Sequence, residues 1–270
     1  MNFSRNKTFP KKKFAAVLRY STILGGKRIR PILGLLAFET ARSSRTKISR
    51  QKALQILLSL ELIHAFSLVH DDLPALDNDA LRRGRPTTWK KFGEANALLA
   101  GDALIFIAFE NLVKNAPSEI SAKLTAILAR SSGAMTVGQF RDLNSRSLQL
   151  SDLLKTHSQK TGALISAAVE MGALLGSADS RKTKLLEKFA QRLGLAFQIK
   201  DDLLDALGDE KLLGKKVGKD LDKKGFVKIL GIAKSQQKLD ALIREAIFLA
   251  QKLRAPKLAK LAEFVLKRER

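Results

Sequence analysis

The chain has 270 residues, of which 45% are hydrophobic, and no cysteine, so one large domain can form a core without disulfides or thiolate metal sites. A formal net charge of +23 would suit a nucleic-acid-binding protein, but the basic residues are spread along the whole chain. One Trp and one Tyr offer little for base stacking, so we expect no specific nucleic-acid binding. A basic, solvated surface with weak attraction to phosphorylated ligands or anionic membrane is the better expectation.

The chain also lacks the common targeting and linker signals. It contains no run of 18 uncharged apolar residues, so we expect no transmembrane segment. The basic stretch Lys11–Lys13 is not followed by the apolar segment of a secretory signal. No Pro-, Gly- or Ser-rich linker divides the chain. The sequence therefore predicts a cytoplasmic protein with a single domain over residues 1–270.

Helical spacing of apolar residues dominates the chain. Helical runs are predicted over residues 51–73, 92–115, 118–140, 151–176, 182–207 and 236–268. Breaks are predicted at residues 25–26, 74–86, 117 and 208–225. Several runs are apolar on more than one side, as in ALLAGDALIFIAFENLV, which is typical of helices inside a bundle. The pattern predicts an all-α bundle of about ten helices.

Acidic residues gather at the ends of two predicted helices. The two clusters are Asp71-Asp72-x4-Asp77 and Asp201-Asp202-x2-Asp205. Pro74 predicts that the first helix ends near Leu73, so Asp71 and Asp72 fall in its last turn, where the helix dipole disfavours carboxylates. Asp201 and Asp205 are four residues apart on a helix, where like charges repel.

Bound divalent cations would make both arrangements favourable, because Mg²⁺ prefers carboxylate oxygens and completes its shell with water and phosphates. A solvated acidic turn, or partners for nearby Lys and Arg, is the alternative for one cluster alone. Nine of the 26 acidic residues lie within residues 71–79 and 201–210, each segment ending a long apolar helix. The pair of clusters therefore favours metal sites.

Basic segments accompany the acidic clusters. GGKRIRP occupies residues 25–31, and LRRGRPT follows the first cluster directly. Arginine forks match phosphate oxygens in pairs, so together with metal carboxylates they indicate a ligand with diphosphate groups. His64 lies two helical turns before Asp71, and Gln198 lies three residues before Asp201, so each shares a helical face with an acidic cluster.

Six motifs then occur in order between about Arg19 and Arg270: GGKRIRP, HAFSLVHDDLPALDNDALRRGRPT, FGEANALLAGDAL, GQFRDL, KTGAL and FQIKDDLLDALGD. The ordered set resembles the trans-isoprenyl diphosphate synthase (polyprenyl synthetase) family, in particular bacterial farnesyl diphosphate synthases. The resemblance implies an isoprenoid-synthase-type all-α fold around a deep central cavity, a homodimer, and Mg²⁺-dependent joining of isopentenyl diphosphate to an allylic diphosphate.

The resemblance also implies roles for individual residues. Three Mg²⁺ ions per active site are implied, held by Asp71, Asp72, Asp77, Asp201, Asp202 and Asp205. The residues implied to contact the allylic diphosphate are Arg82, Lys160 and Lys215. Those implied to grip isopentenyl diphosphate are Lys27, Arg30, His64 and Arg83. The residues implied to line the reaction centre are Gln139, Thr161 and Gln198.

Product length is implied by the residue five positions before Asp71, which is Phe66. A bulky aromatic there, with the two-residue insertion Pro74-Ala75, implies a farnesyl product. A helical wheel places Ser67 more squarely beneath Asp71 than Phe66. One departure from the family is Gly225, which replaces a usual threonine.

Four alternatives accompany this interpretation. The same chemistry could make geranyl or geranylgeranyl diphosphate. A terpene cyclase shares the fold and the first cluster, but Asp201-Asp202-x2-Asp205 argues against the metal triad of cyclases. A basic helical binding protein would not need paired carboxylates, although it would show steep salt dependence of binding. A non-catalytic family member, finally, would not need both ligand sets intact.

Overall fold

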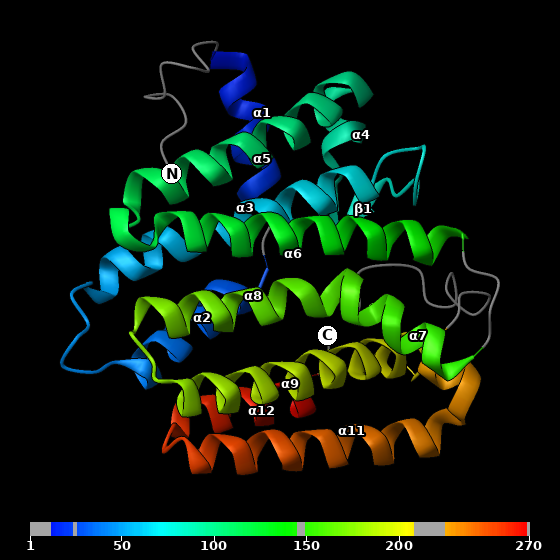
Figure 1. Ribbon diagram of the computed structural model, residues 1–270. Helices are drawn as coiled ribbons and strands as arrows, with labels where there is room; N and C mark the ends of the chain where they lie inside the picture. Colours follow the sequence, from blue (N-terminus) through cyan, green and yellow to red (C-terminus); the bar gives the residue numbers. More distant parts are fainter. Residues whose placement is uncertain (1–11, 24–25, 145–148, 208–224, 269–270) are drawn as a thin grey trace.

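The computed structural model describes residues 12–23, 26–144, 149–207 and 225–268, and these are helical almost throughout. The helices lie in successive layers, with α5 near one end of the molecule and α11 at the other (Figure 1). Their bounds are α1 Lys12–Ile23, α2 Ile29–Ala41, α3 Arg50–Asp71, α4 Thr88–Phe92, α5 Glu94–Asn115, α6 Ser118–Asn144, α7 Leu150–His157, α8 Ala163–Leu175, α9 Ser180–Leu207, α11 Phe226–Lys252 and α12 Pro256–Lys267. The predicted all-α bundle is confirmed.

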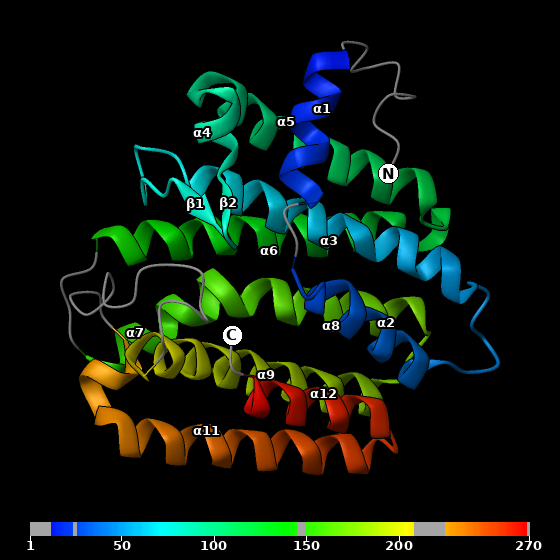
Figure 2. The same ribbon diagram turned by 180° about the vertical axis from the view of Figure 1, so that it is seen from behind.

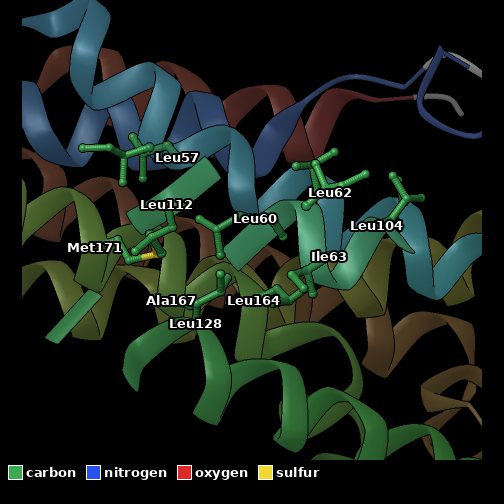
Figure 3. Packing of buried hydrophobic residues seen from close by; sticks show 14 of the residues in the cluster. Leu57, Leu60, Leu62, Ile63, Leu104, Leu112, Leu128, Leu164, Ala167 and Met171 are labelled. Atoms are coloured by element: carbon green, nitrogen blue, oxygen red, sulfur yellow. The ribbon is translucent and has the colours of Figure 1, made fainter. Parts of the chain in front are cut away.

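Helix α3 runs through the first half of the core. Ser49 caps its N-terminus by accepting a hydrogen bond from the backbone N–H of Lys52 at 3.2 Å. Its apolar residues then bury side chains on several faces, because α5 packs along one side of it and α2 and α8 along others. Figure 3 shows Leu60 and Ile63 of α3 among Leu104 of α5 and Leu164 of α8.

A second apolar core fills the other half of the molecule. Leu193 of α9, Ile243 of α11 and Val265 of α12 belong to it, and α8 contributes Val169. Both α2 and α8 have residues in the two cores, so they form the middle layer between them. Figure 2 shows α12 beside α9 on the face where the chain ends.

Helices α3 and α5 have the length and composition of membrane-spanning helices. Each has 22 residues and a mean hydropathy of 1.5 in its most apolar window. In the fold they pack against one another, and 50% of the α3 window and 44% of the α5 window are buried inside the protein. The core of the bundle thus accounts for about half of each apolar window.

Three local features differ from the sequence-based expectation. The run predicted over 151–176 is divided by a π-helical turn, η2 Ser158–Gly162. The run predicted over 236–268 is two helices, α11 and α12, because Pro256 starts a new helix. A short antiparallel hairpin, β1 Leu81–Arg82 and β2 Arg85–Pro86, was not expected. Its strands of two residues are too short for an alternating pattern to be read in the sequence.

Candidate active site

The described residues enclose a cavity of about 570 Å³ between α2, α3, α6, η2 and α9. Residues distant in sequence meet here, as the ordered motifs led us to expect. The predicted site residues that line it are Lys27, Arg30, His64, Phe66, Ser67, Asp71, Arg82, Arg83, Gln139, Lys160, Thr161 and Asp201. Lys215 lies outside the described residues.

The first acidic cluster begins in the last turn of α3, as predicted. After the helix ends at Asp71, the chain folds back, and the backbone N–H of Asp77 donates to the carbonyl of Asp71 at 2.9 Å. The pKa of Asp71 is raised to about 6, chiefly by burial; Lys160 opposes the shift and the nearby Asp77 carboxylate adds to it. The turn therefore brings two carboxyl groups, those of Asp71 and Asp77, close together beside the cavity.

Asp72 points elsewhere. Its carboxylate, only 1% exposed, accepts hydrogen bonds from Arg82 Nε at 2.7 Å and Nη2 at 2.6 Å. Both bonds end on Oδ1, and Asp72 does not belong to the lining of the large cavity. The second aspartate of the cluster thus fixes an arginine, whereas the first faces the cavity.

The hairpin after the first cluster places two arginines. Its two-residue loop is Arg83-Gly84, with φ of 54° and 73°, a conformation that matches the twist of a tight hairpin. Thr87 and Trp89 tie the hairpin to the cluster by donating to the carbonyl of Asp79, each at 2.8 Å. Arg82 and Arg83 consequently both reach the cavity wall.

A second basic group approaches from the start of α2. Arg28 sits in the left-handed region with φ of 51°, and its Nη1 donates to Glu61 of α3 at 2.6 Å. Burial lowers the pKa of Arg30 to about 10, and its Nε has no hydrogen-bond partner among the described residues. Burial also lowers the pKa of His64 well below 6.5, with Arg30 among the charges that add to the shift. His64 is therefore neutral beside charged arginines.

The π-helical turn brings Lys160 and Thr161 to the cavity. A Cβ added at Gly138 of α6 would lie 2.2 Å from the backbone nitrogen of Lys160, so this close approach requires glycine. Lys160 Nζ then pairs with Asp142, one turn further along α6, at 2.5 Å. π-helical turns often mark functional sites, and the sequence carries no periodic signal for one.

A hydrogen-bond chain links η2 to the second acidic cluster. Thr161 donates to Gln198 Oε1 at 3.0 Å, and Gln198 Nε2 donates to Asp202 Oδ1 at 3.2 Å. The other oxygen of Asp202 accepts from the backbone N–H of Phe226 at 2.7 Å. Burial raises the pKa of Asp202 to about 6, although these two donors oppose the shift.

Gly225, the departure from the family pattern, adjoins this chain. A Cβ there would lie 2.9 Å from Asp202 Oδ2, so glycine allows the carboxylate to approach the start of α11. Of the second cluster, Asp201 lines the cavity, while Asp202 is held by Gln198 and Phe226. The two clusters are thus alike in that one aspartate faces the cavity and the next is hydrogen-bonded within the protein.

The acids fit a magnesium site that is completed by a ligand. Among the described residues, no three His, Asp or Glu side chains meet closely enough to hold an ion unaided. Asp71 and Asp201 line one cavity, and Asp77 lies against Asp71. Mg²⁺ commonly takes one or two carboxylates and fills its remaining positions with water and phosphate oxygens. The donor set suits an ion shared with a phosphorylated ligand rather than a closed protein cage.

Phe197 and Arg268 are among the cavity-lining residues that the sequence did not single out. Arg268 stacks on the Phe197 ring, with its guanidinium carbon 3.8 Å from the ring centroid. Phe197 is one apolar residue within an amphipathic helix, and Arg268 is one of 49 basic residues in the chain. Phe197 opens the motif FQIKDDLLDALGD, but nothing in the sequence pairs it with Arg268, and Arg268 lies in no motif.

Comparisons with known proteins show the family of the chain. The polyprenyl synthetase family description matches residues 11–261. The farnesyl diphosphate synthase of Geobacillus stearothermophilus is 42% identical over 237 residues, covering 84% of this chain and 78% of that protein. The geranylgeranyl diphosphate synthase of Cyanophora paradoxa is 43% identical over 239 residues, covering 85% and 78%.

A solved structure gives the same result for the fold. The geranyltransferase of Helicobacter pylori, in complex with magnesium and isoprenyl diphosphate, superimposes with a TM-score of 0.84 at 32% identity. The match covers 95% of this chain and 88% of the other. The chain belongs to the polyprenyl synthetase family and has the fold of its prenyltransferases.

Proposed function

We propose that the chain joins isopentenyl diphosphate head to tail to an allylic diphosphate, dimethylallyl or geranyl, and makes farnesyl diphosphate. The observation that carries this proposal is the meeting of Asp71 and Asp201 in one cavity that is also lined by Arg30, Arg83 and Lys160. Two negatively charged groups opposite several cations suit a ligand pair whose diphosphates need both metal and guanidinium contacts.

In this proposal Asp71, Asp77 and Asp201 hold Mg²⁺, with three ions in each active site. Bound there, Mg²⁺ would act as a Lewis acid and withdraw negative charge from the leaving diphosphate. Asp72 and Asp202 position neighbouring groups instead. The Asp72 carboxylate accepts from Arg82, and the Asp202 carboxylate accepts from Gln198 and from the backbone N–H of Phe226. Of the six aspartates expected from the family motifs, this proposal takes Asp72 and Asp202 off the metal and keeps Asp205, one turn after Asp201 on α9, as a further ligand.

The side chains around the metal acids divide the remaining work. Lys160 and Arg82, with Lys215, neutralise the allylic diphosphate, so that its C–O bond breaks and leaves an allylic cation. Thr161 and Gln198 line the space around that cation, together with Gln139, whose buried Oε1 has no partner among the described residues. The isopentenyl double bond attacks the cation, a C–C bond forms, and a proton leaves to the released diphosphate.

The other diphosphate is assigned to the basic group at the start of α2 and the hairpin. Lys27, Arg30 and Arg83 supply positive charge, and neutral His64 supplies a ring nitrogen that donates or accepts a hydrogen bond. The Arg28–Glu61 ion pair at 2.6 Å holds this segment against α3. The two substrates would then meet between the acidic and the basic walls.

The farnesyl product is assigned from Phe66, which lines the cavity below Asp71 and packs edge-on against His70 with ring centroids 5.2 Å apart. Ser67 also lines the cavity. Relatives of similar identity include both farnesyl and geranylgeranyl diphosphate synthases. The aromatic side chain is therefore the feature on which the product length depends.

We further propose a cytoplasmic homodimer. Members of the family are usually dimeric, and α5 presents four exposed apolar side chains: Leu98, Leu99, Phe106 and Val113. Phe106, at 68% exposure, lies two helical turns from both Leu99 and Val113, so these side chains form one apolar stripe on α5. A second copy packed on α5 would remove these side chains from water.

The test of the activity is a product assay with purified protein, isopentenyl diphosphate, Mg²⁺ and one of dimethylallyl, geranyl or farnesyl diphosphate. Farnesyl diphosphate from the first two partners, and loss of product on chelation of Mg²⁺, is the expected result. Geranylgeranyl or geranyl diphosphate as the end product would reassign the chain length only. No condensation with any partner would overturn the proposal and favour a non-catalytic family member or a basic binding protein.

A further inference from the structure

The last described residue of the chain contacts the second acidic cluster. Arg268 follows the C-terminus of α12, and its Nη2 donates to Asp201 Oδ1 at 2.5 Å and to the carbonyl oxygen of Phe197 at 2.8 Å. The Arg268 side chain is only 4% exposed. A charged group buried to this degree normally has a partner that compensates its lost hydration, and here that partner is Asp201.

Packing holds the guanidinium in place as well as charge does. Arg268 lies over the Phe197 ring at 3.8 Å, so one face of its guanidinium is covered by an aromatic side chain of α9. Its backbone N–H donates to the carbonyl of Phe264 and closes the end of α12. Arg268 Nε is buried without a partner among the described residues. The side chain is therefore fixed at the cavity wall by the ring and the carbonyl of Phe197 as well as by Asp201.

Asp201 is the acid of the second cluster that faces the cavity, and its side chain is 40% exposed. The proposed function assigns a divalent ion to this carboxylate. A guanidinium on one of its oxygens neutralises charge that the ion would otherwise use and repels the ion directly. The Asp201 carboxylate would thus be shared by two cations, the Arg268 guanidinium and the divalent ion.

Resting on the proposed function, we propose that Arg268 is a built-in competitor of the divalent ion at Asp201 and sets the metal affinity of the second cluster. Its contact with Asp201 must weaken before the ion can bind fully. The alternative role for such an arginine is to orient Asp201 for the ion. The two roles predict opposite changes in affinity when the guanidinium is removed.

The test is a Mn²⁺ titration followed by electron paramagnetic resonance, with inorganic pyrophosphate at fixed concentration. Arg268→Gln should bind Mn²⁺ more tightly than the wild type, by about threefold or more, since it removes a partly buried charge contact. Arg268→Met puts an uncharged apolar side chain beside the Phe197 ring and should change Mn²⁺ affinity in the same direction. Lys267→Gln is the matched control, because it removes the same charge from the neighbouring, exposed position.

The effect must depend on Asp201. In an Asp201→Asn background, Arg268→Gln should leave Mn²⁺ affinity unchanged, and circular dichroism reports whether each variant is folded. Unchanged or weaker binding by both Arg268 variants would overturn the proposal, as would an equal gain from Lys267→Gln. Failure of the proposed function would instead appear as wild-type protein that forms no product, whatever its Mn²⁺ affinity.

Discussion

Arg82 donates from Nε and Nη2 to the same oxygen of Asp72, at 2.7 and 2.6 Å, although Asp72 directly follows the cavity-lining Asp71. Two adjacent carboxylates therefore have different tasks. α3 ends between them, so their side chains diverge, and the hairpin that carries Arg82 closes over Asp72, with Asp79 Oδ2 4.0 Å from Arg82 Nη2. Asp71 is therefore available to a ligand in the cavity, whereas Asp72 fixes the position of Arg82 in the cavity wall.

The first prediction follows from this separation. Asp71→Asn should reduce the rate of condensation by roughly 100-fold or more, because it removes charge from the group that faces the diphosphate. Asp72→Asn should reduce it less and should instead lower the free energy of unfolding by about 1–3 kcal/mol, because it weakens a buried charged contact. Initial rates and urea unfolding of both variants provide the measurement. Equal rate losses with unchanged stability would assign Asp72 to the metal as well.

The second prediction concerns product length. Phe66→Ala should shift the product from farnesyl toward geranylgeranyl diphosphate, because it deletes the aromatic side chain from the cavity wall below Asp71. Chromatographic sizing of the products measures the shift. Phe109→Ala is the matched control, since Phe109 packs against the same apolar core but does not line the cavity. An unchanged product from Phe66→Ala would remove Phe66 as the stop and leave Ser67 as the next residue to test.

Much of this site could be predicted from the sequence because its residues lie in short, ordered motifs on predicted helices. The helix end at Asp71 follows from Pro74, and the shared face of His64 and Asp71 follows from helical spacing. Both positions depend on local rules. The fold then only had to bring whole helices together, which their apolar faces ensure.

The remainder depends on contacts that local rules do not contain. Asp72 is directed by a hairpin whose strands have two residues each, and η2 interrupts a run that reads as continuous helix. Arg268 reaches Asp201 only because α12 packs beside α9. These features arise from the packing of distant segments, so each side chain's orientation became clear only in the folded chain.

The third prediction uses the close contact between α6 and η2. Gly138→Ala should lower the free energy of unfolding by about 1–3 kcal/mol and reduce activity, because the new methyl group meets the backbone of Lys160. Gly133→Ala on the same helix meets nothing within 4 Å and should be neutral or stabilising by about 0.5–1 kcal/mol. Urea unfolding of the two variants separates the effects. A stabilising Gly138→Ala would show that η2 can move away from α6 at no cost.

The fourth prediction is a pH dependence of stability from His157, a buried residue whose ring stacks on Phe226 with centroids 5.3 Å apart. Burial lowers the pKa of His157 from 6.5 to about 4, with Asp142 opposing the shift and Lys160 adding to it. As the pH falls below 6.5, His157 becomes protonated in the unfolded chain, whereas in the folded chain it becomes protonated only near pH 4. The free energy of unfolding therefore falls over that range.

Between pH 7 and pH 5, this residue should cost the wild type about 2 kcal/mol of unfolding free energy. His157→Phe should lack this part of the pH dependence, because a phenyl ring keeps the stack on Phe226 and binds no proton. Urea unfolding of both proteins at the two pH values gives the difference directly. Parallel pH profiles of stability for the wild type and His157→Phe would contradict the prediction, because they would mean that His157 has the same pKa in the folded and the unfolded chain.

The fifth prediction concerns the apolar face of α5. Phe106→Asp should convert a dimer to a monomer, because it places a charge in the middle of the face that we assign to the second copy. Light scattering measures the mass. Phe248→Asp is the matched control: Phe248 is 54% exposed, but it lies on α11, at the opposite end of the stack of helices (Figure 1). If Phe248→Asp rather than Phe106→Asp dissociates the dimer, the interface lies on α11, and the exposed side chains of α5 need another explanation.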